Sequence, residues 1–230
     1  TPAASALSEF GIEGMGMVST RADELRATVS ADGQRIIWAS NREGGVDGWD
    51  LWQATLQDKR WMDPQPLALN SAADEVDPFL SVDGRWLYFA SNRKGGRGGF
   101  DLYRAPLAAN GDIGAPQPLG TTVNGRQDER SPALSDDGRL LFASDRGGGG
   151  GWDLWVAARD GDGFAAPVPL VGINTAADEV DGSWLGGGRA VVVARTNTQG
   201  GTQLWVSQCH QRQWGQIGRA ACRGRVEAIV

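Results

Sequence analysis

The side chains of this sequence most suited to chemistry are acidic, and they recur in pairs. The pairs are Asp23-Glu24, Asp74-Glu75, Asp128-Glu129 and Asp178-Glu179, and their first residues are 51, 54 and 50 positions apart. Carboxylates gathered around one axis could bind a hard cation, because Ca²⁺ prefers oxygen ligands. A cation site is therefore one chemistry to weigh against a purely structural role.

A repeated arginine and a second repeated aspartate follow each of the first three pairs. They are Arg42, Arg93 and Arg146, and Asp50, Asp101 and Asp153. Residues that recur in every copy of a repeat usually stabilise the repeat rather than form one site. We therefore expect each guanidinium to pair with the repeated Glu or Asp as an internal brace, and we predict no metal site.

The positions that differ between the repeats are better candidates for binding. Three residues after the first Asp of each pair, the sequence has Arg26, Asp77, Ser131 and Asp181. If four repeats form a ring, Asp77 and Asp181 lie opposite each other, and the four side chains line a polar mouth at the axis. We predict that this mouth binds a ligand, an ion or a peptide end; the alternative is a solvated rim.

Other catalytic chemistry finds little support in the sequence. His210 is the only histidine and lies beside Cys209, but adjacent side chains generally point apart and no third group orients them. One His and two Cys are too few for a tetrahedral zinc site. The glycine-rich loops 44–48, 95–99 and 147–151 lack the Gly-Lys-Ser/Thr ending of a phosphate loop. We predict no catalytic residue and no cofactor.

Each repeat contains the signals of four short strands. A turn such as Asp32-Gly33 follows the acidic pair, and an apolar run such as Ile36-Ile37-Trp38-Ala39 comes next. A glycine-rich loop then leads to an aromatic-Asp-Leu-aromatic strand, and a proline-containing outer strand closes the repeat. A lone four-stranded sheet leaves both faces wet, so the copies must pack on one another, which predicts a β-propeller rather than a β-sandwich.

The repeat also resembles a known family. The run DEVDPFLSVDGRWLYFASNRKGGRGGFDLY, residues 74–103, is similar to the WD-repeat-like propeller repeat of TolB and of propeller modules attached to OmpA-like envelope proteins. The similarity covers about residues 21–217. It implies a propeller fold, a bacterial envelope setting that is periplasmic or secreted, and use as an interaction module with a protein partner.

We expect one all-β propeller domain over residues 1–230, with four-stranded antiparallel blades. The repeats are predicted at about 21–70, 71–124, 125–174 and 175–220, and segments 1–20 and 221–230 are predicted to close the ring. Four blades are favoured and five are the runner-up. The fourth copy lacks the Asp of the turn and the Asp of the third strand, so its loops should differ in shape.

Charge and hydropathy limit the partners. With 28 acidic and 22 basic residues the formal charge is −6, which argues against nucleic acid. No apolar run reaches the roughly 18 residues of a membrane span. The leading hypothesis is a non-catalytic scaffold that binds a protein partner of the cell envelope. The alternative is a carbohydrate-binding or glycan-cleaving propeller that uses channel carboxylates such as Asp77 and Asp181.

Overall fold

Each repeat of the sequence folds into one antiparallel sheet. The structure is a computed structural model that describes residues 16–108, 110–147, 151–197, 199–210, 213–214 and 218–219. The first sheet contains β1 (Glu24–Val29), β2 (Arg35–Ser40), β3 (Asp50–Gln57) and β4 (Arg60–Pro66). The second contains β5 (Glu75–Leu80), β6 (Trp86–Ser91), β7 (Asp101–Pro106) and β8 (Gln117–Pro118).

The other two sheets repeat this order with additions. The third contains β9 (Glu129–Leu134), β10 (Leu140–Ser144), β11 (Asp153–Ala157) and β14 (Val168–Pro169), with a separate hairpin of β12 (Arg159–Asp160) and β13 (Gly163–Phe164). The fourth contains β15 (Glu179–Leu185), β16 (Ala190–Thr196), β17 (Thr202–His210) and β18 (Gln213–Trp214), and β19 (Gly218–Arg219) also pairs with β17.

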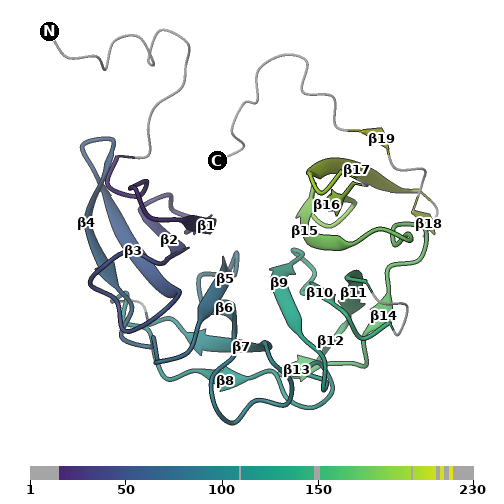
Figure 1. The fold of residues 1–230 in the computed structure, drawn as a ribbon, viewed down its shortest axis with the longest axis horizontal. Helices are drawn as coiled ribbons and strands as arrows, with labels where there is room; N and C mark the ends of the chain where they lie inside the picture. The colour runs from purple at the N-terminus through teal and green to yellow at the C-terminus, as the bar shows by residue number, and fades with distance from the viewer. Residues whose placement is uncertain are drawn as a thin grey trace, which may run out of the picture.

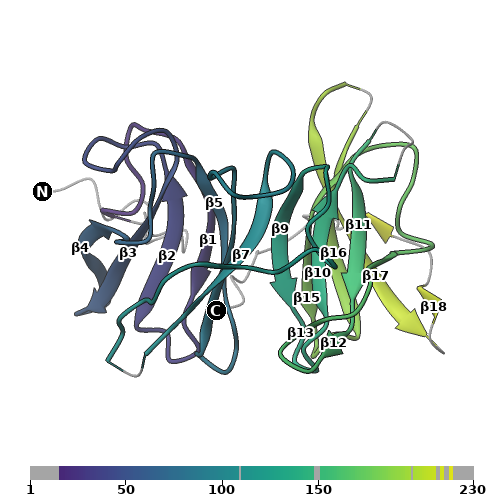
Figure 2. The same ribbon diagram turned by 90° about the horizontal axis from the view of Figure 1, so that it is seen from below.

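The four sheets are the blades of a β-propeller, as the repeat pattern predicted. The first strand of each blade, β1, β5, β9 or β15, lies nearest the centre, and the later strands follow outward (Figure 1). Seen from the side, the blades stand next to one another as twisted sheets (Figure 2). No helix that could cross a membrane occurs among the described residues.

In blades 1 to 3 the second strand forms the core because its side chains are apolar on both faces, whereas β16 of blade 4 is only partly buried. Ile37, Leu87 and Leu141 are fully buried, as expected for a strand covered on both sides. The preceding turn is fixed by a serine and a glycine. In blade 1, Ser30 Oγ donates to Asp32 Oδ1 over 2.5 Å, and Gly33 has a φ of +69°, which glycine adopts without strain.

The blades are joined by a repeated clamp that uses the Asp-Glu pair. The backbone N–H of Trp49 in blade 1 donates to Asp74 Oδ1 of blade 2 over 3.0 Å, and the N–H of Glu75 donates to the carbonyl of Trp49 over 2.7 Å. The same bonds link Phe100 to Asp128-Glu129 and Trp152 to Asp178-Glu179. The first Asp of each later pair therefore holds the preceding blade.

The predicted closure of the ring by the two ends of the chain falls mostly outside the described residues. Of segment 1–20, Val18 is buried against Trp38 and Trp52 of blade 1. Residues 1–15 and 220–230 are not described. Closure by these segments, and the single-domain boundaries that include them, stay predictions.

Candidate functional site

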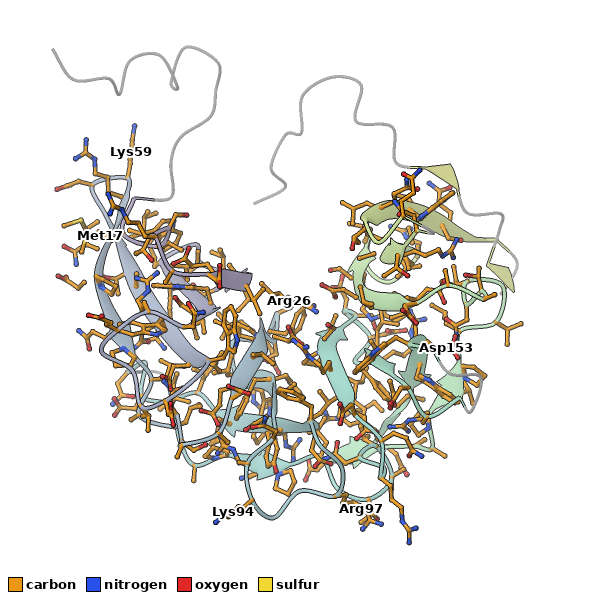
Figure 3. The ribbon with its side chains drawn as sticks, in the orientation of Figure 1. Met17, Arg26, Lys59, Lys94, Arg97 and Asp153 are labelled. Atoms are coloured by element: carbon orange, nitrogen blue, oxygen red, sulfur yellow. The ribbon has the colours of Figure 1, made fainter. Side chains whose placement is uncertain are left out.

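The four side chains predicted to line the axial mouth lie together on the inner strands. Each inner strand has a shift in register at or beside this position, which is the mark of a β-bulge. Asp77 and Ser131 have φ values of +55°, so the bulge turns them away from the normal alternation of the strand. Figure 3 shows Arg26 on the inner side of blade 1, facing the centre of the ring.

Hydrogen bonds link these residues across blades. Arg26 Nη1 donates to Asp181 Oδ1 over 2.6 Å, which joins blade 1 to blade 4. The backbone N–H of Ser131 donates to Asp77 Oδ2 over 3.1 Å, and Ser131 Oγ donates to the carbonyl of Val180 over 3.2 Å. The structure thus brings all four predicted residues into one connected cluster, which we term the axial cluster; whether it binds a ligand stays a prediction.

Arg130 belongs to the axial cluster although the sequence analysis did not select it. Its Nε donates to Asp77 Oδ2 over 3.0 Å, and its guanidinium carbon lies 5.0 Å from the centre of the Phe100 ring. The equivalent residues of the other inner strands are Leu25, Val76 and Val180. A charged residue at an otherwise aliphatic repeat position was the signal that could have identified it.

The axial cluster is balanced in charge. Asp181 pairs with Arg26, and Asp77 pairs with Arg130. Burial raises the pKa of Asp181 above its ordinary value, and the charge of Arg26 opposes that rise. Each carboxylate accepts a hydrogen bond from a guanidinium, so the cluster consists of two ion pairs.

A cleft of about 410 Å³ adjoins the cluster between blades 1 and 4. Residues of β1, β5, β15, β16 and β17 line it, with Arg26 and Asp181 among them. Leu204 of β17 also lines the cleft and is 52% exposed, whereas its equivalents Leu51, Leu102 and Leu154 are 0% exposed between blades. The cleft therefore presents an apolar surface of the kind that is buried elsewhere in the ring.

The repeated charges form braces within the blades. Arginine Nη2 pairs with glutamate Oε1 in Arg42–Glu24 (3.1 Å), Arg93–Glu75 (2.9 Å) and Arg146–Glu129 (2.7 Å). The repeated aspartates instead hold the glycine loops: Asp50 Oδ2 accepts from the N–H of Val46 over 2.8 Å, and Asp101 Oδ2 from that of Arg97 over 2.7 Å. The guanidinium partner in these braces is thus Glu rather than Asp.

The third of these aspartates, Asp153, occupies the same place in blade 3. One of its carboxylate oxygens would lie 2.6 Å from a Cβ at Gly147, so the loop passes directly over the carboxylate. Burial raises the pKa of Asp153 and of Asp50. Both aspartates are therefore placed to hold loops rather than to contact a ligand.

Blade 4 has the same brace, built from a residue that the sequence analysis missed. Arg195 Nε donates to Glu179 Oε1 over 2.6 Å, and its Nη2 donates to the carbonyl of Ile173 over 2.6 Å. Arg195 occupies the position of Ser40, Ser91 and Ser144, two residues before the arginine of the other blades. Blade 4 therefore has the same Arg–Glu contact as the other blades, but its arginine comes from a different position of the repeat, so the repeat alignment did not reveal it.

The glutamates of the acidic pairs are engaged in braces rather than free for the cation ring considered from the sequence. The glutamates of the four pairs each contact an arginine within their own blade. Among the residues that the structure describes, no group of three or more His, Cys, Asp or Glu side chains could hold a metal ion. The side chains of Cys209 and His210 lie outside the described part of the chain.

Comparison with known proteins identifies the fold. No family model and no curated protein matches the sequence. The structure is similar to TolB from Acinetobacter baumannii, with a TM-score of 0.61 and 15% identity over 87% of this chain and 44% of that one. A putative TolB from Agrobacterium tumefaciens gives a TM-score of 0.61 and 15% identity, over 87% of this chain and 62% of that one.

A third similar structure has an enzymatic name. The periplasmic gluconolactonase PpgL from Pseudomonas aeruginosa gives a TM-score of 0.55 and 18% identity, over 86% of this chain and 58% of that protein. The chain therefore spans less than two thirds of each of these three proteins. At these identities the similarity establishes a TolB-like propeller fold and leaves activity open.

Proposed function

We propose that this protein is a non-catalytic binding scaffold of the bacterial cell envelope, periplasmic or secreted. In this proposal the axial cluster and the adjoining cleft bind a protein partner. The proposal is supported by the TolB-like fold and by the shape and chemistry of the cleft between blades 1 and 4. The observation that carries it is the exposure of Leu204.

The exposed surface of blade 4 indicates what kind of partner fits. Inside the ring, the equivalent leucines Leu51 and Leu102 are covered by the inner strand of the next blade. On the opposite wall, Val29 of β1 is 39% exposed, whereas its equivalent Leu80 is 7% exposed. An extended segment with alternating aliphatic side chains would cover both walls in the way that an inner strand does.

The axial cluster supplies the polar part of this recognition. The Arg26–Asp181 pair lies at the inner end of the cleft, and Thr28 and Ser183 line it farther along. A charged side chain of the partner, or its free chain end, could take the place of either Arg26 or Asp181 in this ion pair. Such contacts fix orientation, while the apolar walls provide most of the affinity.

The glycan-cleaving alternative has weaker support. Glycoside hydrolysis needs two carboxyl groups, one of which acts as an acid. Asp77 and Asp181 are each engaged in an ion pair with an arginine, so neither carboxyl group is free to act on a glycosidic bond. The gluconolactonase named above shares the fold with this chain, but the shared fold alone does not transfer its activity.

The proposal is tested by affinity capture from an envelope extract, followed by calorimetry with the purified candidate. We expect Leu204→Asp to weaken binding by at least tenfold, because one buried aliphatic contact contributes about 1.5–3 kcal/mol. Val171→Asp is the matched control, since Val171 is 78% exposed and does not line the cleft. Equal binding by both variants would refute the cleft as the site.

Hydrogen exchange locates the contact independently of mutation. Bound partner should slow amide exchange in β1 and β15, whose inner edges face the axis, and leave the outer strand β4 unchanged. Sedimentation of the protein alone distinguishes a foreign partner from a second copy. If the native protein is a dimer and the Leu204→Asp variant is a monomer, the cleft binds a second copy of the protein and not an envelope partner.

A further inference from the structure

Blade 4 is the one blade whose face is not covered by an inner strand among the residues that the structure describes. At the other interfaces the inner strand of a blade packs across the first three strands of the blade before it. Thus β5 packs across β1, β2 and β3, β9 across β5, β6 and β7, and β15 across β9, β10 and β11. β1 does not pack across β15, β16 and β17 in this way, and blades 1 and 4 lie at the two ends of the arc of sheets (Figure 1).

The apolar side chains of this face match those that the other blades bury. Val192 and Ala194 of β16 and Leu204 of β17 line the cleft. Their equivalents are completely buried in every other blade: Ile37, Ala39 and Leu51; Tyr88, Ala90 and Leu102; and Leu141, Ala143 and Leu154. In blade 4, Val192 and Ala194 are only partly buried and Leu204 is exposed. Blade 4 therefore presents the surface on which an inner strand docks.

The backbone of blade 4 also carries the donor half of an inter-blade clamp. Thr202 occupies the repeat position of the clamp residues Trp49, Phe100 and Trp152. The N–H of each of those residues donates to an aspartate of the next blade, and its carbonyl accepts from the N–H of the following glutamate. Thr202 is exposed and makes no such bond within the described part of the chain. Exposed strand groups of this kind are a template for pairing with another chain.

The shape of the face sets a second requirement, four residues after the clamping Asp. In β15 this residue is Gly182, and a Cβ there would lie 2.9 Å from Leu141 Cδ2 and 3.0 Å from Leu154 Cδ1. The equivalent residues of the other inner strands are also compact: Ala27, Pro78 and Pro132. Leu204 occupies the place of Leu154. A long side chain at this position of an incoming strand would therefore clash with Leu204.

We propose that the partner inserts an extended segment into the cleft, with an Asp four residues before a Pro, Gly or Ala. In this arrangement the Asp carboxylate accepts from the N–H of Thr202, and the N–H of the next residue donates to the Thr202 carbonyl. The compact residue lies on Leu204, as Gly182 lies on Leu154. This inference rests on the proposed function, because it describes the partner of the same cleft.

Titration of the whole protein with a peptide of the sequence Ala-Ala-Asp-Glu-Val-Asp-Pro-Phe-Leu-Ser, residues 72–81, tests the proposal, because this segment makes the clamp on blade 1. We expect the native protein to bind it and the Thr202 amide proton to move downfield in heteronuclear NMR. The Asp74→Ala peptide should bind at least about tenfold more weakly, because a hydrogen bond to a charged acceptor is lost. The Pro78→Leu peptide should also bind more weakly.

Glu75→Ala is the matched control peptide. It removes the same charge as Asp74→Ala, but in the fold the Glu75 carboxylate contacts Arg93 of its own blade rather than the preceding blade. It should therefore bind as the parent peptide does. The inference is overturned if the two alanine peptides bind equally, if Pro78→Leu binds as tightly as the parent, or if the parent peptide does not bind.

The Leu204→Asp protein separates this inference from the proposed function. If that variant loses the parent peptide while the two alanine peptides bind the native protein equally, the cleft is the site and the clamp is wrong. If the envelope partner binds Leu204→Asp as it binds the native protein, the proposed function itself fails. A native protein that is dimeric alone and monomeric with the peptide would assign the cleft to a second copy and overturn the inference.

Discussion

Glu129 accepts one long hydroxyl bond, from Ser144 Oγ over 3.4 Å, but it is the one brace glutamate with no hydroxyl residue four positions before it. Adding that second hydroxyl should stabilise the protein. Ser71 Oγ donates to Glu75 Oε1 over 2.6 Å, and Thr175 Oγ1 donates to Glu179 Oε1 over 2.7 Å. The equivalent residue four positions before Glu129 is Gly125, which provides only its N–H, at 3.0 Å. We predict that Gly125→Ser adds the missing bond.

The absence of this hydroxyl has an electrostatic consequence. Burial raises the pKa of Glu129 to about 7, although Gly125 and Arg146 oppose the rise. In blade 1 burial acts in the same direction, but the bonds from Thr20 hold the pKa of Glu24 below its ordinary value. Glu24 is also more exposed than Glu129, 21% against 0%, so burial accounts for part of the difference, and the hydroxyl is the part that a substitution can supply.

The sign of the pH dependence follows from the raised pKa. Between about pH 4.5 and 7 the folded protein retains a proton on Glu129 that the unfolded chain has lost, so the free energy of unfolding falls as pH rises. The full effect is at most about 3–4 kcal/mol, at about 1.4 kcal/mol per pH unit. Above about pH 7 the loss is complete.

Gly125→Ser should recover about 1–2 kcal/mol of this loss at about pH 8, because a hydrogen bond to a charged group contributes about 1.5–3 kcal/mol. At about pH 5, where Glu129 is protonated in the fold, the gain should be small. A Cβ at position 125 would lie 3.1 Å from Gln127 Oε1 and 3.2 Å from Glu129 Oε1, so only side-chain ends must shift.

Urea unfolding of the native protein, Gly125→Ser and Gly125→Ala at both pH values is the assay. Gly125→Ala adds the same Cβ without a hydroxyl, so it isolates steric and backbone effects from the new bond. A native stability that does not change between about pH 5 and 7 would refute the reasoning. So would an equal gain from serine and alanine at about pH 8.

Two further predictions concern the braces and the clamps. Arg195→Ala should lower the free energy of unfolding by about 3 kcal/mol, because it leaves the fully buried Glu179 without its charge partner. Urea unfolding measures this change, and a loss below about 1 kcal/mol would contradict the stabilising role of the Arg195–Glu179 pair. Asp74→Ala should cost about 1–2 kcal/mol more than Asp23→Ala in the same assay, because only Asp74 accepts from the N–H of Trp49 in a preceding blade. Equal losses would show that the inter-blade bond contributes nothing.

The fold was predictable because the repeat fixes local structure and packing at the same time. The turn at Asp32-Gly33 and the apolar run after it predict a hairpin, and four copies leave few arrangements other than a propeller. Four residues of the axial cluster, all except Arg130, were also selected from the sequence, since they vary where the repeats otherwise agree. Their mutual contacts, such as that between Arg26 and Asp181, depend on the curvature of the ring, which no local pattern encodes.

Three features could not be read from the repeat alignment. Arg195 contacts Glu179 from a repeat position two residues earlier than that of the other brace arginines, so aligning the repeats does not show that it has the same role. The charge of Arg130 stands out in the alignment, but its contact with Asp77 depends on a bulge, which changes which side chains face the axis. Leu204 is exposed because no inner strand among the described residues covers it, although it occupies the repeat position of the buried Leu51.

The clamp between neighbouring blades also determines how cooperative the ring is. Each clamp runs in one direction, from the third strand of a blade to the Asp-Glu pair of the next, so the blades are coupled as nearest neighbours. Among the described residues, blades 2 and 3 are clamped on both sides, whereas blades 1 and 4 are each clamped on one side and meet at the Arg26–Asp181 pair. Thermal opening should therefore begin at the terminal blades, which are the ones that form the cleft, and the middle blades should act as the rigid base on which that cleft opens and closes.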